Sequence, residues 1–161
     1  MAPAFLSRFN FLKIPIDNGI KFRNKPLLGK NKTYKGLIGG IVFSIIITLI
    51  QYYLYNLGYF HSISLIDYNL INPILLGFLM GFGAMFGDLV ESFFKRQINI
   101  KPGKPLYFLD QTDWIIGSTF FLMLVYVPDL LTFLVTLLLG FILHLLVKNM
   151  GYYLKLEKSR W

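Results

Sequence analysis

Residues 73–94, with the sequence PILLGFLMGFGAMFGDLVESFF, decide the fold class of this chain. The stretch is long and apolar enough to cross a membrane as a helix, which takes roughly 20 such residues. Its final turns contain Asp88 and Glu91. Charged groups in a bilayer are expensive and by default mark a functional site. The segment therefore predicts a membrane-spanning helix whose last turns form part of a functional site.

Three further stretches predict spans, at about residues 37–55, 109–127 and 130–147. The composition agrees, because 55% of the residues are hydrophobic and only 15% are charged, whereas about a quarter are charged in soluble proteins. The absence of cysteine excludes disulfides and thiol catalysis. We predict an all-α, polytopic membrane helical bundle with four spans, in a single domain over residues 1–161.

The 16 lysine and arginine residues fall into three groups: eight before the first span, four between the second and third, and four after the last. Four spans place all three groups on one side, which the positive-inside rule makes the cytoplasm. Residues 15–36 and 95–108 are then cytoplasmic loops. The net charge of +8 predicts anionic lipids and phosphate-bearing substrates as partners, not nucleic acid. The sequence predicts no oligomeric state.

Two acidic pairs lie at the cytoplasmic ends of adjacent predicted spans. Asp88 and Glu91 are three residues apart, and Asp110 and Asp113 repeat that spacing. Four carboxylates held together repel one another unless a cation neutralises them. Oxygen ligands without histidine or cysteine suit magnesium, manganese or calcium. The acids therefore predict a metal site.

Basic residues beside the acids allow two interpretations. Lys95, Arg96 and Lys101 could pair with the carboxylates at the interface, as snorkelling side chains do, or could hold phosphate oxygens beside a metal. Residues 29–36, GKNKTYKG, lie on the same face and are only superficially like a phosphate-binding loop. A metal site beside phosphate-binding residues in a membrane protein indicates phosphoryl or nucleotidyl transfer to a lipid. These features do not distinguish a kinase from a phosphatase or a nucleotidyltransferase.

Three separated motifs resemble those of the membrane CTP-transferases that make CDP-lipids. They are the Ser-x-x-Lys-Arg-x4-Lys run that begins at Ser92, the Leu-Asp-Gln-Thr-Asp run of residues 109–113, and the N-terminal runs at residues 15–19 and 28–37. Gln111 stands where bacterial and eukaryotic phosphatidate cytidylyltransferases have arginine, and their Gly-His-Gly-Gly stretch is absent. Those departures resemble the archaeal branch, the CDP-archaeol synthases.

The resemblance implies Mg²⁺-dependent transfer of a cytidylyl group from CTP to 2,3-bis-O-(geranylgeranyl)-sn-glycerol 1-phosphate in the cell membrane, with the site facing the cytoplasm. Asp88 and Asp110 would be the main metal ligands, joined by Asp113 and Glu91, with Lys95 also catalytic. The residues expected to bind CTP phosphates or the lipid phosphate are Lys30, Asn31, Lys32, Thr33, Lys95, Arg96 and Lys101.

Two other functions remain as alternatives: a phosphatidate cytidylyltransferase with a diacyl substrate, and a small cation-translocating protein. The first predicts a preference for ester lipids, and the second predicts acids near the bilayer midplane. The resemblance also implies an additional N-terminal span, which would make five. Residues 1–14 would then be the end of that helix.

Overall fold

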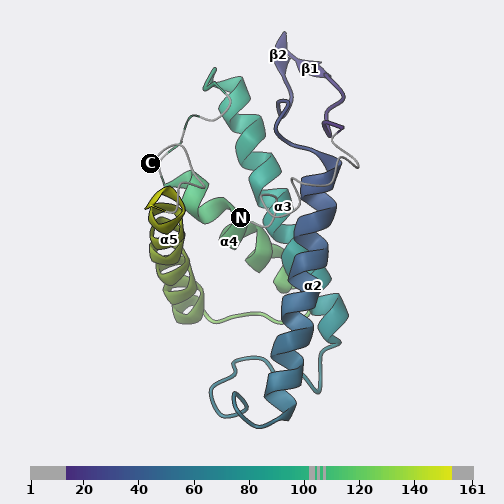
Figure 1. Ribbon diagram of the computed structural model, residues 1–161, viewed down its shortest axis with the longest axis vertical. Helices are drawn as coiled ribbons and strands as arrows, with labels where there is room; N and C mark the ends of the chain where they lie inside the picture. Colours follow the sequence, from purple (N-terminus) through teal and green to yellow (C-terminus); the bar gives the residue numbers. More distant parts are fainter. Residues whose placement is uncertain (1–13, 102–103, 105, 107, 154–161) are drawn as a thin grey trace.

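The computed structural model describes residues 14–101, 104, 106 and 108–153. Its helices are α2 (Tyr34–Asn56), α3 (Pro73–Gln97), α4 (Leu109–Leu122) and α5 (Leu130–Tyr153), preceded by the short antiparallel strands β1 (Lys21–Phe22) and β2 (Lys25–Pro26). The predicted helical bundle is confirmed (Figure 1). The expected end of an N-terminal helix falls in residues 1–13, outside the described part.

Three of the helices, α2, α3 and α5, are long and apolar enough to span a membrane. Helix α4 has 14 residues and, at 1.5 Å per residue, extends about 21 Å. The predicted third span is therefore helical only as far as Leu122, and turns follow it. Helix α3 continues to Gln97, so Lys95 and Arg96 lie in its last turn instead of opening a loop.

Side chains before the helices fix where three of them begin. Thr33 accepts a hydrogen bond from Gly36 N (3.3 Å) at the start of α2. Asn72 accepts from Ile74 N (2.9 Å) before Pro73, and Asp129 accepts from Thr132 N (2.6 Å) before α5. Such caps satisfy amide groups that have no partner within the helix.

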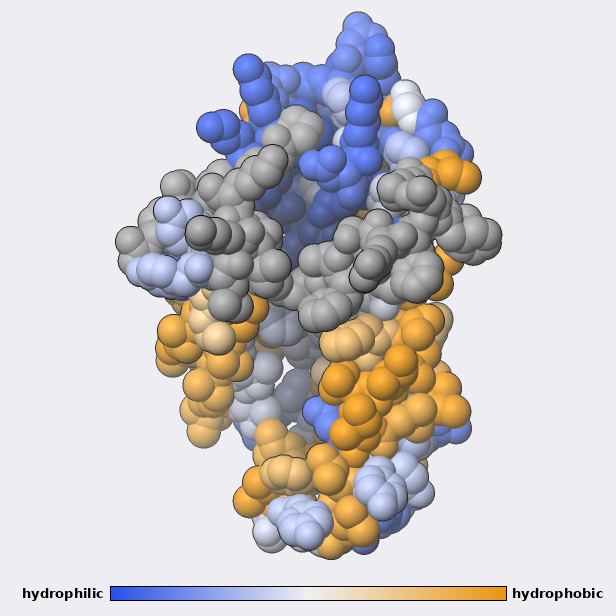
Figure 2. Space-filling view, viewed as in Figure 1, coloured by the Kyte–Doolittle hydropathy of each residue, from blue (hydrophilic) through white to orange (hydrophobic). Residues whose placement is uncertain are grey.

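Polar and apolar surfaces separate along the long axis of the molecule. The strand pair and the carboxyl end of α3 lie at one end, opposite the loop between α2 and α3 (Figure 1). Hydrophilic residues gather at the strand end, and hydrophobic residues cover the helices below it (Figure 2). Most apolar side chains of α2 and α5 face outward. Lipid is the solvent that suits such a surface.

Helix α3 packs between α2 and α4. Glycines allow both contacts, since a Cβ atom at Gly81 would lie 2.7 Å from Ser44 Cβ of α2, and one at Gly83 would lie 2.8 Å from the Ser118 Cα of α4. Gly87 lies against the Asp113 carbonyl. Small residues let helix backbones approach closely in membranes. The acid-bearing ends of α3 and α4 are therefore brought into direct contact.

The segment before α2 folds back over the end of α3. Strands β1 and β2 are joined by Arg23 and Asn24, with φ of 50° and 62°, the geometry of a tight two-residue hairpin turn. The Lys25 side chain donates a hydrogen bond to the Gln97 carbonyl, and the Phe22 ring lies 5.8 Å from that of Phe93. This contact holds the N-terminal segment beside the acidic residues.

The α3–α4 contact makes a stability prediction. Replacing Gly117 by alanine forces a methyl group against the Gly83 carbonyl, and we expect a loss of about 1–3 kcal/mol, as for other overpacked cores. Thermal unfolding in detergent measures it. The matched control is Gly36→Ala, whose Cβ would lie 3.6 Å from Thr33 Oγ1 in ordinary contact. Equal melting temperatures for Gly117→Ala and wild type would contradict the packing argument.

Candidate active site

Three carboxylates converge where α3 meets α4. Asp88 and Glu91 come from α3 and Asp113 from α4, and each offers an oxygen within 4.8 Å of the others. The first two share a helical face because they are three residues apart. Asp113 reaches them because Gly87 leaves room for its backbone. The fold therefore brings one residue of the second acidic pair, Asp113, to the first pair.

Lys95 lies between Glu91 and the fourth acid, Asp110. Its Nζ atom lies 2.6 Å from Glu91 Oε1 and 2.5 Å from Asp110 Oδ1. The side chains of Lys95 and Glu91 are only 10% and 6% exposed. Asp110 also accepts a hydrogen bond from Leu106 N (3.1 Å). Asp110 therefore faces Lys95 and lies outside the cluster of three.

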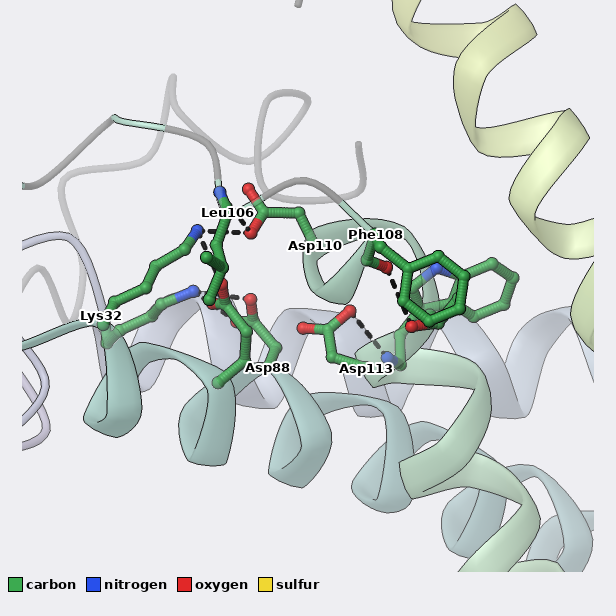
Figure 3. A network of polar contacts seen from close by, with 10 residues as sticks. Lys32, Asp88, Leu106, Phe108, Asp110 and Asp113 are labelled. Carbon is green, nitrogen blue, oxygen red and sulfur yellow. Dashed lines mark hydrogen bonds and ion pairs between the residues drawn. The ribbon is translucent and has the colours of Figure 1, made fainter. Parts of the chain in front are cut away.

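Lys32 reaches the cluster from the N-terminal segment. Its Nζ atom donates to both oxygens of Asp88, each at 2.6 Å (Figure 3). Asp113 lies on the other side of Asp88 and accepts a hydrogen bond from Trp114 N (2.7 Å). A cation that is 56 positions away in the sequence thus meets the acids of α3 and α4.

The charges of the site leave a place for a metal ion. When all groups are ionised, the four carboxylates outweigh the ammonium groups of Lys32 and Lys95 by two negative charges, which one divalent cation balances. Glu91 is buried, and its Oε1 atom forms an ion pair with Lys95. A set of carboxylate donors fits Mg²⁺.

The predicted phosphate-binding residues divide into two groups. Arg96 is buried beside Gly29, and its Nε and Nη1 atoms have no hydrogen-bond partner among the residues that the structure describes. Buried guanidinium groups normally have a partner, so this one is suited to an anionic ligand. Lys30, Asn31 and Lys101 are exposed, and Thr33 caps α2.

A cavity of about 310 Å³ opens beside Asp88. Its polar part includes Lys32, Thr33 and Lys35, and its apolar part includes Leu37 and Met85. A lining that combines cations with apolar groups suits a phosphate attached to an apolar or aromatic group. Of the three clustered acids, Asp88 is the one that such a ligand would meet in this cavity.

No sequence pattern predicts a role for Asp17, although the residue lies in the N-terminal run of residues 15–19. This buried residue accepts hydrogen bonds from the backbone N–H groups of Gly29, Leu28 and Gly19, at 2.9, 3.0 and 3.2 Å. Burial raises the pKa of the Asp17 carboxyl, but the three N–H groups outweigh it and hold the pKa below its usual value. Asp17 is therefore charged at neutral pH.

Comparisons with known proteins agree on one family. The family model of CarS-like CDP-archaeol synthases matches residues 11–161. The CDP-archaeol synthase of Methanococcoides burtonii is 32% identical over 157 residues, covering 91% of this chain and 90% of that protein. The one from Methanocaldococcus jannaschii is 34% identical over 149 residues, covering 91% and 83%.

A solved structure shares the fold. It is described as an intramembrane enzyme for archaeal membrane lipid biosynthesis, and it aligns with a TM-score of 0.63 at 23% sequence identity. The alignment covers 83% of this chain and 77% of that one. The arrangement of helices around the acidic cluster is therefore that of a known membrane fold.

The buried lysine of the site makes a second stability prediction. Lys95→Met would leave Glu91 and Asp110 facing each other without a cation, and removing one partner of a buried pair costs about 3 kcal/mol or more. Thermal unfolding in detergent should show a clear loss. Lys21→Met, which removes an exposed lysine in β1, is the control that should melt like wild type. Equal loss in both variants would show that the buried ion pairs are not the cause.

Proposed function

This chain belongs to the CDP-archaeol synthase family, and we propose that it transfers a cytidylyl group from CTP to 2,3-bis-O-(geranylgeranyl)-sn-glycerol 1-phosphate. It is a CTP-dependent cytidylyltransferase of archaeal membrane lipid biosynthesis. The observation that carries the finer proposal is the cluster of Asp88, Glu91 and Asp113, bordered by cations at the polar end of a membrane bundle.

The proposed reaction is a displacement at phosphorus. An oxygen of the lipid phosphate forms a bond to the α-phosphorus of CTP, the bond from that phosphorus to the β-phosphate oxygen breaks, and diphosphate leaves. A phosphate monoester is already ionised at neutral pH, so no strong general base is required. This agrees with a site composed of carboxylates and cations.

Asp88, Glu91 and Asp113 would hold Mg²⁺ through carboxylate oxygens. When bound, the ion supplies charge neutralisation at the reacting phosphate and the leaving diphosphate. Lys95 orients Glu91 and compensates the charge of Asp110. We assign Asp110 to this supporting arrangement, and it remains the other candidate ligand from the sequence.

Arg96 and Lys32 are the cations best placed for CTP phosphates. Arg96 is buried with free donors among the described residues, and a guanidinium can hold two phosphate oxygens at once. Lys32 lies 2.6 Å from Asp88, so a phosphate next to the carboxylates would come within its reach. The exposed residues Lys30, Asn31 and Lys101 would add attraction at the entrance.

We place the site at the cytoplasmic face of the cell membrane. Support comes from the sequence, in which all lysines and arginines fall into three segments that four spans would place on one side of the membrane. Hydrophilic residues also gather at the strand end of the molecule (Figure 2). CTP is available on that side. The isoprenoid chains of the substrate would lie along the apolar surfaces of the helices, whose many outward-facing leucine, isoleucine and phenylalanine side chains suit them.

The test is product formation by the purified full-length chain with labelled CTP, MgCl₂ and the ether-lipid phosphate. We expect a CDP-lipid and diphosphate in equal amounts, with a diacyl lipid phosphate as the competing substrate. Asp88→Asn and Asp113→Asn should each lower kcat by at least about a hundredfold, because even the loss of an outer-shell partner of a metal ligand costs about 10–100-fold.

Asp67→Asn is the matched control for these variants. Asp67 lies in the loop at the opposite end and accepts a hydrogen bond from the Tyr55 hydroxyl (3.2 Å), so its loss should leave turnover unchanged. Near-normal turnover in Asp88→Asn and Asp113→Asn would remove both as metal ligands. A wild-type chain that makes no CDP-lipid would refute the proposed reaction.

A further inference from the structure

We propose that Asp17 is a positioning residue, which holds the turn of residues 29–32 so that the Lys32 ammonium meets Asp88 and the phosphates of CTP. The identity of that ligand rests on the proposed function. The position of Lys32 in the resting protein does not, so the two can be tested separately.

The first support is the set of hydrogen bonds that the buried Asp17 carboxylate accepts. It is 5% exposed, and its Oδ2 atom accepts from both Leu28 N and Gly29 N, whereas Oδ1 accepts from Gly19 N. It makes no ion pair with any residue that the structure describes. A carboxylate that satisfies three backbone donors ties together chain segments up to 12 residues apart.

The second support is the hydrogen bonding that connects this carboxylate to Lys32. Ile16 N, next to Asp17, donates to the Lys32 carbonyl (2.8 Å), and Lys32 N donates to the Gly29 carbonyl (3.2 Å). Pro15 and Thr33 form an isolated antiparallel bridge. The backbone on both sides of Lys32 is thus held within one small unit that Asp17 closes.

The third support is the left-handed backbone at Gly29. With φ of +95°, this position favours glycine, and the residue lies against the Arg96 side chain, 3.6 Å from Cδ to the place of a Cβ atom. The same turn therefore supplies Lys32 to Asp88 and covers Arg96. A change in its position would move one proposed phosphate-binding cation and uncover the other.

Holding the turn matters because lysine is long and flexible. An ammonium on four methylene groups has many rotamers, and small errors in placement weaken a site strongly. With its backbone held, Lys32 loses less freedom when it contacts Asp88 or a phosphate. Without Asp17, the N–H groups of Leu28 and Gly29 lose their buried acceptor. Unsatisfied buried donors cost free energy, which favours movement of the turn to a position where water can accept these hydrogen bonds.

The first experiment measures the position of Lys32 without catalysis. Brief acetylation of the purified chain with acetic anhydride, followed by mass spectrometry, gives the reaction rate of each lysine, with exposed Lys30 as the internal reference. Pairing with Asp88 should protect Lys32 in the wild type. Asp17→Asn should raise its rate about tenfold, the factor expected for losing one hydrogen bond to a charged group.

Asp129→Asn is the matched control. Asp129 also accepts a backbone hydrogen bond, from Thr132 N at 2.6 Å. It immediately precedes α5, at the end of that helix that is far from the acidic cluster. Its loss should leave the rate at Lys32 unchanged. An unchanged rate at Lys32 in Asp17→Asn would overturn the proposal. If Asp17→Asn fails to accumulate in membranes, Asp17→Glu displaces the turn while keeping the charge, and unaltered protection there would overturn the proposal equally.

The second experiment is a double-mutant cycle with Lys32→Met in the CTP assay. Asp17→Asn alone should raise the KM for CTP about tenfold and leave the KM for the lipid phosphate unchanged. In the Lys32→Met background, the same substitution should add less than about twofold, because residues that act together are not additive. Equal factors in both backgrounds would show that Asp17 acts on the fold in general and would overturn the positioning role.

The two hypotheses fail in different ways. If the wild-type chain makes no CDP-lipid but Asp17→Asn exposes Lys32 to acetylation, the proposed reaction is wrong and the positioning role stands. If the chain is active and Lys32 is equally protected in both proteins, the reaction stands and the positioning role is wrong.

Discussion

The direct contact between the backbones of α3 and α4 is the constraint on which the site depends. At Gly83, Gly87 and Gly117 the two backbones touch with no side chain between them, and a larger residue at any of these positions would push the helices apart. That contact brings Asp113 of α4 beside Asp88 and Glu91 of α3. The glycines at this contact thus determine the distance between the acids.

Carboxylates brought so close must be compensated, because repulsion and desolvation both oppose their charged forms. The fold provides two ammonium groups from different places, Lys95 within α3 and Lys32 from the N-terminal segment. When all groups are ionised, these two cations leave two of the four negative charges uncompensated. The remaining negative charge is what makes the cluster suitable for a divalent ion, and Arg96 beside it suits the anion that accompanies such an ion.

The sequence allows two interpretations of the basic residues: pairing with the carboxylates, or binding of phosphate. The structure supports both. Lys95 is held in ion pairs with Glu91 and Asp110, as the pairing interpretation expected. Arg96, its neighbour in the chain, is buried with donors that no described residue occupies. One turn of helix thus contributes a residue that stabilises the site and a residue that is suited to substrate.

The sequence by itself determined the helices, their order and the clustering of cations at one end, because hydrophobic length and the placement of lysine and arginine are local properties of the chain. It also singled out Asp88, Glu91 and Asp113, whose carboxylates lie together in the fold. It could not separate Asp110 from them, since Asp110 and Asp113 have the same spacing as the α3 pair. Only the tertiary structure decided that Asp110 faces Lys95, that α4 ends at Leu122, and that Asp17 closes the turn carrying Lys32. These depend on helix rotation and on contacts between distant residues, which no local pattern of residue types encodes.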